Sequence, residues 1–231
     1  MLNVRNIDDL YASLPSINVI APARSNGRTK DQVEIYSIVR LLGTLPIGPG
    51  DFPLQLDKSE RPDFILQCGE RQVGVEHTEA IPPNAAKEAA IRSQGAGEEL
   101  HFLRRASVDE PRKSSKLLAA EIDANSYGSS WGGDSVEREW SGAMAYFIKK
   151  KLSVAEKQGF KLLDATWLLI YDNWPAPALD PKKGIEFLRA HLSEIAPWTT
   201  FEHVFILDEK VLLDLSEVGA VSYQVNHCLP T

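Results

Sequence analysis

The segment "RPDFILQCGERQVGVEHTEA", residues 61–80, has the strongest strand pattern of the chain. It contains two short apolar runs joined by "CGE", a glycine-containing loop of the length that links hairpin strands. Strand residues alternate between two faces, so Val73, Val75 and His77 are expected on one face, and Glu76 belongs to the other. Asp63 and Glu76 therefore stand at the edges of strands whose remaining residues favour burial. The sequence thus raises the question of which groups these two carboxylates contact in the folded protein.

A helix is predicted directly before this hairpin, in "TKDQVEIYSIVRLLGTL", residues 29–45. Thr29 followed three residues later by Gln32 fits a capping box, and Gly43 is expected to end the helix. The apolar residues spread around most of the helix, so it is predicted to be largely buried. Glu34 is the one acid within that apolar run.

The flanking segments complete the predicted fold. Residues 1–28 are expected to be irregular, and residues 52–56 to form an edge strand, because Pro53 cannot donate to a ladder. Downstream, the patterns predict helices at 84–94, 111–124, 136–158 and 181–196, and strands at 165–173, 202–209, 210–215 and 221–225. This order predicts an α/β fold with a mixed central sheet flanked by helices. We expect one domain over residues 1–231, with a helical and loop insertion at about 81–138.

Composition narrows the class of protein. The chain has 231 residues, 43% of them hydrophobic, which suffices for one sizeable core. No apolar run reaches the roughly 18 residues that span a bilayer, and no signal peptide pattern opens the sequence. Cys68 and Cys228 are too few for a disulfide framework, so both are expected to be reduced thiols in a cytoplasmic protein.

The charge pattern bears on partners. The formal net charge of -7 counts mildly against nucleic acid, because phosphate binding normally accompanies a basic excess. The local field matters more than the sum, however, and one segment is rich in cations. It contains Arg92, Arg104, Arg105, Arg112, Lys113 and Lys116. Either this segment is a solvated surface or it contacts an acidic partner.

Several catalytic classes are excluded by missing motifs. His77 and Glu79 form the H-x-E of zinc deaminases, but the required downstream P-C-x-x-C is absent. The sequence also lacks H-E-x-x-H, G-x-x-x-x-G-K-[ST] and G-x-G-x-x-G. The acidic residues remain as candidates. Converging carboxylates repel each other unless a cation lies between them, and oxygen ligands favour Mg²⁺ or Mn²⁺.

Together, "RPDFILQ" and "QVGVEHTEA" resemble the core of the PD-(D/E)XK nuclease superfamily, the restriction-endonuclease-like fold. The resemblance places Pro62 and Asp63 at the PD motif, Glu76 at the acid of the second motif, and Glu34 at the acid of the preceding helix. It implies a core of helix, three strands, helix and strand over about residues 29–173. It also implies a Mg²⁺ or Mn²⁺ site held by these three acids, with the backbone carbonyl of His77 as a further ligand.

The sequence departs from the family at one position. Thr78 stands where the family has its lysine, and a hydroxyl cannot supply the positive charge that stabilises a cleaved phosphodiester. In some members the lysine has moved to the following helix, and this chain has "FIKKKL" there, residues 147–152. Lys151 borders the apolar stripe of that helix, so its ammonium is expected to reach the sheet. Lys150 is the second choice.

The leading expectation is thus a metal-dependent nuclease-like hydrolase acting on DNA, with Glu34, Asp63, Glu76 and Lys151 as its catalytic residues. One alternative is a non-catalytic module on the same fold that binds nucleic acid or protein. Another is a glycosidase that uses two carboxylates, for which only Trp131 and Trp140 are candidate sugar contacts. No membrane partner is expected. The sequence leaves open the choice between DNA and RNA and the existence of a homodimer.

Overall fold

The central feature of the protein is one eight-stranded mixed sheet. A computed structural model of the chain describes residues 1–17, 27–97, 104–124, 130–155 and 163–225. Across the sheet the strands follow chain order from β1 to β8. The pairs β4–β5 and β5–β6 are parallel, and all other neighbouring pairs are antiparallel. The strands are β1 (Leu2–Val4), β2 (Leu54–Lys58), β3 (Phe64–Cys68), β4 (Arg71–Ala80), β5 (Ala165–Asp172), β6 (His203–Leu207), β7 (Val211–Leu215) and β8 (Ala220–Gln224).

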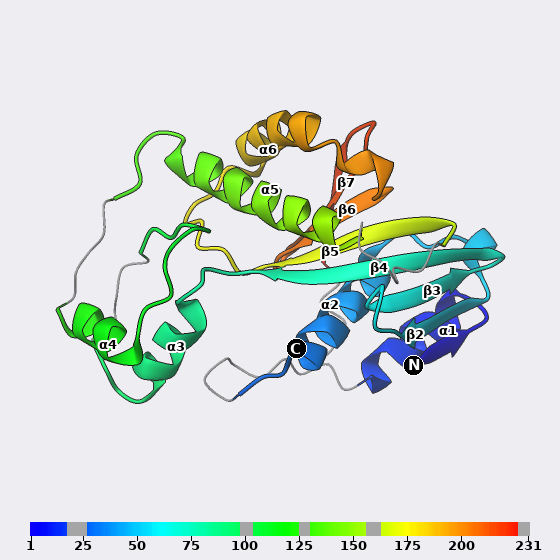
Figure 1. The fold of residues 1–231 in the computed structure, drawn as a ribbon. Helices are drawn as coiled ribbons and strands as arrows, with labels where there is room; N and C mark the ends of the chain where they lie inside the picture. The colour runs from blue at the N-terminus through cyan, green and yellow to red at the C-terminus, as the bar shows by residue number, and fades with distance from the viewer. Residues whose placement is uncertain (18–26, 98–103, 125–129, 156–162, 226–231) are drawn as a thin grey trace.

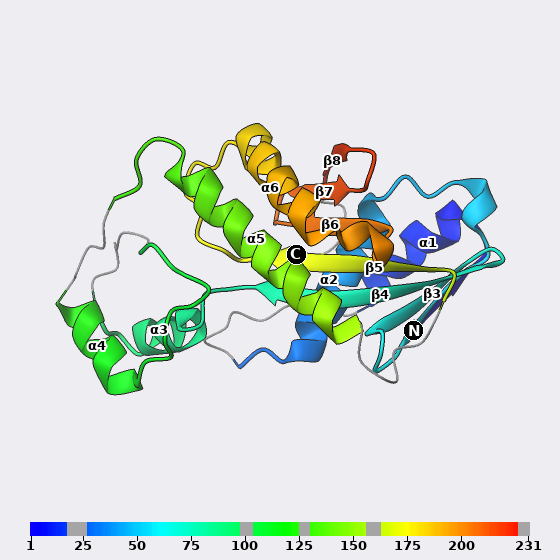
Figure 2. The same ribbon diagram turned by 45° about the horizontal axis from the view of Figure 1, so that its top comes forward.

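Helices cover both faces of this sheet, as the α/β prediction requires. They are α1 (Ile7–Ser13), α2 (Lys30–Thr44), α3 (Ala85–Ser93), α4 (Ser115–Asp123), α5 (Ser135–Ala155) and α6 (Pro181–Ile195), with 3₁₀ turns at Leu14–Ser16, Pro49–Asp51 and Pro197–Thr199. Figure 1 shows α1 and α2 on one face of the sheet and α5 and α6 on the other. The pair α3 and α4 lies beyond the end of β4, away from both layers (Figure 2).

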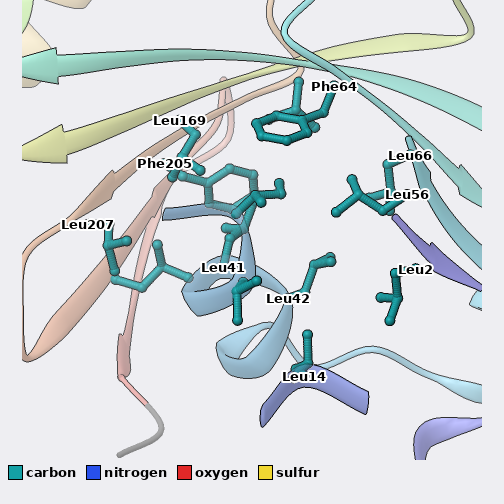
Figure 3. Close-up of a cluster of buried hydrophobic side chains, with 14 of the residues drawn as sticks. Leu2, Leu14, Leu41, Leu42, Leu56, Phe64, Leu66, Leu169, Phe205 and Leu207 are labelled. Atoms are coloured by element: carbon teal, nitrogen blue, oxygen red, sulfur yellow. The ribbon is translucent and has the colours of Figure 1, made fainter. Parts of the chain in front are cut away.

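Each face of the sheet carries its own apolar core. On the α2 side, Leu41 and Leu42 pack toward Leu66 and Phe205 of the sheet (Figure 3). On the other side, α5 and α6 pack on β5 and β6 through residues such as Trp140 and Ile170. Burying one side chain of this size contributes about 1.5–3 kcal/mol. The predicted alternation along β4 is confirmed, because Val73 and Val75 belong to the α2-side core.

The helix α2 begins as predicted and ends later than predicted. The Thr29 hydroxyl accepts from the Gln32 amide, and the Gln32 side chain accepts from the Thr29 amide, which completes the capping box. The helix passes through Gly43 and ends after Thr44. Gly43 is the penultimate residue of the helix, so the helix ends one residue after the glycine that was expected to stop it.

Two further predictions near the N-terminus are wrong. Residues 2–13 form β1 and α1, where irregular structure was expected. The alternating Leu2 and Val4 are buried against the sheet, and Asn6 caps α1 by accepting from the Asp9 amide. As a result, the strand near Pro53 is not an edge: it begins at Leu54 as β2 and pairs with β1 on one side and β3 on the other.

The insertion between β4 and α5 is held together by ion pairs. Arg104 contacts Glu88 and Glu110, both at 2.7 Å. The buried Asn84 side chain donates to the Pro111 carbonyl at 3.0 Å. The helix predicted at 111–124 starts only at Ser115, because the Ser114 hydroxyl accepts from the Leu117 amide and so acts as the N-cap.

Among the helices that the structure describes, none is long and apolar enough to cross a bilayer. Cys68 is a free thiol among the described residues, and burial raises its pKa to about 11, so it stays protonated at pH 7. Cys228 lies outside the described residues.

Candidate functional site

The acidic residues gather where β3 begins and β4 extends beyond it, paired only with β5 among the described strands. Phe64, the first residue of β3, pairs with Val75, so residues 76–80 of β4 have no partner on the β3 side. Asp63 lies directly before β3 and fills this position: its Oδ2 accepts from the His77 amide at 2.8 Å. A carboxylate thus replaces a ladder hydrogen bond.

Asp63 is the centre of the site, because cations reach it from both faces. Lys30 Nζ of α2 lies 3.2 Å from Asp63 Oδ1, and Lys151 Nζ of α5 lies 3.4 Å from Asp63 Oδ2. Burial alone would raise the pKa of this carboxyl. The Lys151 charge, the His77 amide and the Lys30 charge together hold the pKa below its ordinary value. Asp63 is therefore an anion at neutral pH although it is only 6% exposed.

Glu76 and Lys151 form the closest pair of the site. Glu76 points to the α5 face of the sheet, where its Oε2 accepts from Lys151 Nζ at 2.6 Å. Burial raises the pKa of the Glu76 carboxyl, and the neighbouring charge of Asp63 adds to the rise, while Lys151 opposes it. The Lys151 side chain is 17% exposed. Its stem follows the border of the α5 stripe, and its ammonium bridges Glu76 and Asp63.

Glu34 lies on the opposite face, in α2, with its own cations. The side chain is 1% exposed and pairs with Lys58 through Oε2 and with Lys30, at 2.7 Å, through Oε1. Despite this short distance, Glu34 Oε1 accepts no hydrogen bond of acceptable geometry from the described residues. The structure thus connects Glu34 to Asp63 through the Lys30 ammonium, and Asp63 to Glu76 through the Lys151 ammonium.

The His77 side chain serves the core. Its ring shares a 3.0 Å hydrogen bond with the Ser37 hydroxyl of α2, and burial lowers the pKa of the imidazole to about 3. The ring is therefore neutral at pH 7. The backbone of His77, unlike its ring, faces the acidic residues. Because the amide and carbonyl of one strand residue point to the same neighbouring strand, the His77 carbonyl faces the side of Asp63.

A pocket of about 520 Å³ opens onto this site. Its lining combines residues of α2, β4 and α5, among them Lys30, His77, Thr78, Lys150 and Lys151. Thr78, where the resemblance leads one to expect a lysine, also lines the wall. The exposed side chain of Lys150 stands at the same wall, so the pocket offers positive charge beside the buried acids.

The donor set allows a test of whether a divalent cation fits. As the side chains stand, no group of three or more His, Cys, Asp and Glu in the described part of the chain is arranged to hold a metal. Nevertheless, Glu34 Oε1 is a buried oxygen without a hydrogen bond, and Asp63 Oδ1 faces the same point, the Lys30 ammonium. Two carboxylates of this kind suit Mg²⁺, which keeps several waters and substrate oxygens.

Sequence reasoning missed the two lysines on Glu34. Lys30 and Lys58 balance, together with Lys151, the three buried acids. One signal for Lys30 was available, because it stands four residues before Glu34 and so shares its helix face. Lys58 could not have been found this way, because its approach depends on how β2 lies beside α2.

The basic segment of the insertion is largely neutralised. Arg104 is paired as described above, Arg105 contacts Glu139, and Lys113 contacts Glu121 at 2.9 Å. Arg112 and Lys116 are exposed. Much of this positive charge therefore stabilises the insertion itself.

The candidate sugar contacts are occupied elsewhere. Trp140 is 1% exposed and donates to Asp172 at 2.6 Å, and Trp131 donates to Glu139 at 3.0 Å. Among the described lining residues of the pocket there is no Trp, Tyr or Phe. The discriminating feature of the glycosidase alternative is therefore missing from this site.

The site thus consists of three buried carboxylates, two of them joined by a lysine from the following helix, beside a pocket with a basic wall. Comparisons of the chain with protein-family models, with curated proteins and with solved structures found no match.

Proposed function

We propose that the protein is a metal-dependent, nuclease-like hydrolase of the PD-(D/E)XK type that cleaves phosphodiester bonds in DNA. The element order supports this proposal, because α2, β2–β4, α5 and β5 follow one another as helix, three strands, helix and strand, with α3 and α4 as the insertion. The supporting arrangement of the site includes Asp63 before β3 and Glu76 on the neighbouring strand.

One observation carries the proposal: the Lys151 ammonium lies 2.6 Å from Glu76 and 3.4 Å from Asp63. Thr78 leaves the second motif without a cation, and α5 supplies one at the same pair of carboxylates. A structural lysine at this position of the helix would more simply remain in solvent, as the exposed Lys149 and Lys150 do. A buried pair gains little net stability over apolar packing, so its placement favours a functional role.

In this proposal, Asp63, Glu34 and Glu76 and the carbonyl of His77 hold Mg²⁺ or Mn²⁺. When bound, such a cation lowers the pKa of a water and stabilises charge on phosphorus. Two further contributions come from lysines of the chain. The Lys151 ammonium meets the negative charge that grows on the phosphoryl oxygens, a contribution to the transition state more than to binding. The exposed Lys150 and the pocket wall attract the phosphate backbone.

The first experiment measures cleavage of closed circular plasmid DNA by the purified protein, with millimolar Mg²⁺ or Mn²⁺ and with EDTA. We expect nicking or linearisation only with the metal. Asp63→Asn and Glu76→Gln should abolish it, and the exposed Asp57→Asn on β2 serves as the matched control. Lys151→Ala should lower the rate by about 10²-fold or more, the effect of losing one preorganised donor, while Lys149→Ala behaves like the parent. Plasmid that stays intact under all conditions would refute the proposed nuclease activity.

A second measurement is independent of cleavage. A cation that binds only the folded state raises the melting temperature. Mg²⁺ or Mn²⁺ should therefore stabilise the parent, and Asp63→Asn should remove this stabilisation. An unchanged melting curve at millimolar metal would count against a cation site.

One observation favours the alternative of a binding module on the same fold. Lys30, Lys58 and Lys151 already balance the three acids, so the site is electrically complete from its own side chains. Binding of DNA in the presence of Mg²⁺ without any cleavage, with Asp63→Asn binding as the parent does, would establish this alternative.

A further inference from the structure

Lys30 is placed against two rules of local stability. It occupies the first position of α2, where a cation opposes the helix dipole. It also precedes its partner Glu34 by four residues, and this order of a lysine and a glutamate is the weaker one. A residue that breaks such local rules in order to meet two buried carboxylates is expected at a functional site.

The contacts of Lys30 converge on one point of the site. Its ammonium lies 2.7 Å from Glu34 Oε1 and 3.2 Å from Asp63 Oδ1, two oxygens on buried side chains. The first of these oxygens is neutralised but accepts no hydrogen bond of acceptable geometry from the described residues. The ammonium donates a hydrogen bond to Asp63 Oδ1 and supplies mainly charge to Glu34 Oε1, so a hard cation that coordinates both oxygens could take its place.

The two lysines of Asp63 differ in how firmly they are held. The Lys151 side chain is 17% exposed, whereas the Lys30 side chain is 74% exposed. Only the tip of Lys30 enters the site, so it can leave by rotation about its own side-chain bonds, without a movement of α2. The more buried Lys151 side chain, in contrast, cannot leave the site unless α5 moves.

We propose that the Lys30 ammonium and a divalent cation compete for one place, between Glu34 and Asp63, so that metal binding releases Lys30. This inference rests on the proposed metal site and adds its regulation. Lys30 keeps the acids neutralised until a cation arrives, and it sets the cation concentration at which the site fills. Once released, its ammonium remains at the wall of the same pocket, where a substrate phosphate is the counter-charge that it has lost.

The test compares Mn²⁺ affinity, measured by isothermal titration calorimetry, among the parent, Lys30→Gln and Lys150→Gln. Both variants remove one positive charge from the same pocket, and only Lys30 contacts the acids. Glutamine is an adequate helix former, so α2 is retained. Lys30→Gln should bind Mn²⁺ about tenfold more tightly than the parent. Lys150→Gln should change the affinity by less than about twofold, because screening weakens its longer-range effect.

A second readout follows the lysine itself. Brief acylation with an amine-reactive ester, followed by peptide mass spectrometry, should modify Lys30 several-fold faster when Mn²⁺ is present. The reactivity of the exposed Lys149 should not change. A parent that binds Mn²⁺ while Lys30→Gln binds it equally or more weakly would overturn the competition and leave the nuclease proposal standing. If neither protein binds Mn²⁺, both proposals fall. Tighter binding by Lys30→Gln without any DNA cleavage would sustain the competition alone.

Discussion

Replacing Lys151 with methionine gives a sharp test of the electrostatics of the site. Methionine keeps most of the apolar stem and removes the ammonium that lies 2.6 Å from Glu76 and 3.4 Å from Asp63. The two carboxylates would then share a buried region without this cation. Removing one partner of a buried pair typically costs about 3–5 kcal/mol. The variant can limit this cost, however, by protonating Glu76, whose pKa burial already raises.

The limit follows from the pKa of Glu76 in the unfolded chain, about 4.3. Keeping the carboxyl protonated in the folded state at pH 7 costs about 2.7 pKa units, or about 3.7 kcal/mol at about 1.36 kcal/mol per unit. We therefore expect Lys151→Met to lose about 2–4 kcal/mol of unfolding free energy at pH 7. At pH 5 the same bound is only about 1 kcal/mol.

The sign of the pH dependence is fixed by proton binding. In the variant, the folded pKa of Glu76 lies above its unfolded value, so the folded state binds more protons between the two values. The free energy of unfolding therefore falls as the pH rises through this window. Asp63 acts in the same direction. Its depressed pKa stabilises the parent above the unfolded pKa, and the variant loses part of this contribution.

Urea denaturation at pH 5 and pH 7, in EDTA, measures the difference between variant and parent. Lys149→Met, which alters an exposed lysine of the same helix, should stay within about 0.5 kcal/mol of the parent. A Lys151→Met protein as stable as the parent at pH 7, or a deficit that grows toward pH 5, would refute the reasoning.

Three further predictions concern other parts of the fold. Gly74→Ala should lower the unfolding free energy by about 1–3 kcal/mol, because a Cβ there would lie 2.8 Å from the rigid ring of Pro62. Any cleavage activity should fall as well, because the shift of Pro62 displaces Asp63. A variant as stable as the parent in urea would contradict this prediction. Thr29→Ala should lower the unfolding free energy by about 1 kcal/mol through loss of the α2 cap, whereas Thr29→Ser should restore most of it. Burial raises the pKa of Asp172 to about 6, so between pH 4 and pH 6 the folded protein binds the extra proton and loses stability as the pH rises. Relative to Asp172→Asn, the parent should thus lose about 3 kcal/mol across that window, and a constant difference would show that Asp172 does not titrate there.

The parts of the fold that the sequence predicts are those with strong periodicity or a local cap. The hairpin of residues 61–80 gives β3 and β4, and β4 spans Arg71–Ala80, the run expected from the sequence. Thr29 and Gln32 define the start of α2 through contacts three residues apart. The first residues escaped prediction because β1 is short, and its strand character depends on pairing with β2, a distant segment.

The residues of the candidate site likewise fall into those that a local sequence pattern indicates and those that depend on long-range packing. The patterns around Asp63, Glu76 and Lys151 are local: a strand edge, an alternation and the border of a helix stripe. The position of Glu34 relative to the others depends on long-range packing, and the structure separates its carboxylate from Asp63 by the Lys30 ammonium. No local pattern indicates which cation fills a gap between carboxylates from different elements.

The chain order of the strands carries a consequence for assembly during synthesis. Residues 30–80 bring α2 and β2–β4 together through contacts of short sequence separation, and such contacts form early. The parallel pairing of β4 with β5 must wait until the insertion and α5 have left the ribosome. A nascent chain of this length already holds Asp63 and Glu76 but lacks Lys151. We therefore expect α5 to dock late in folding, driven by burial of its apolar stripe, and to bring Lys151 to the two acids only then.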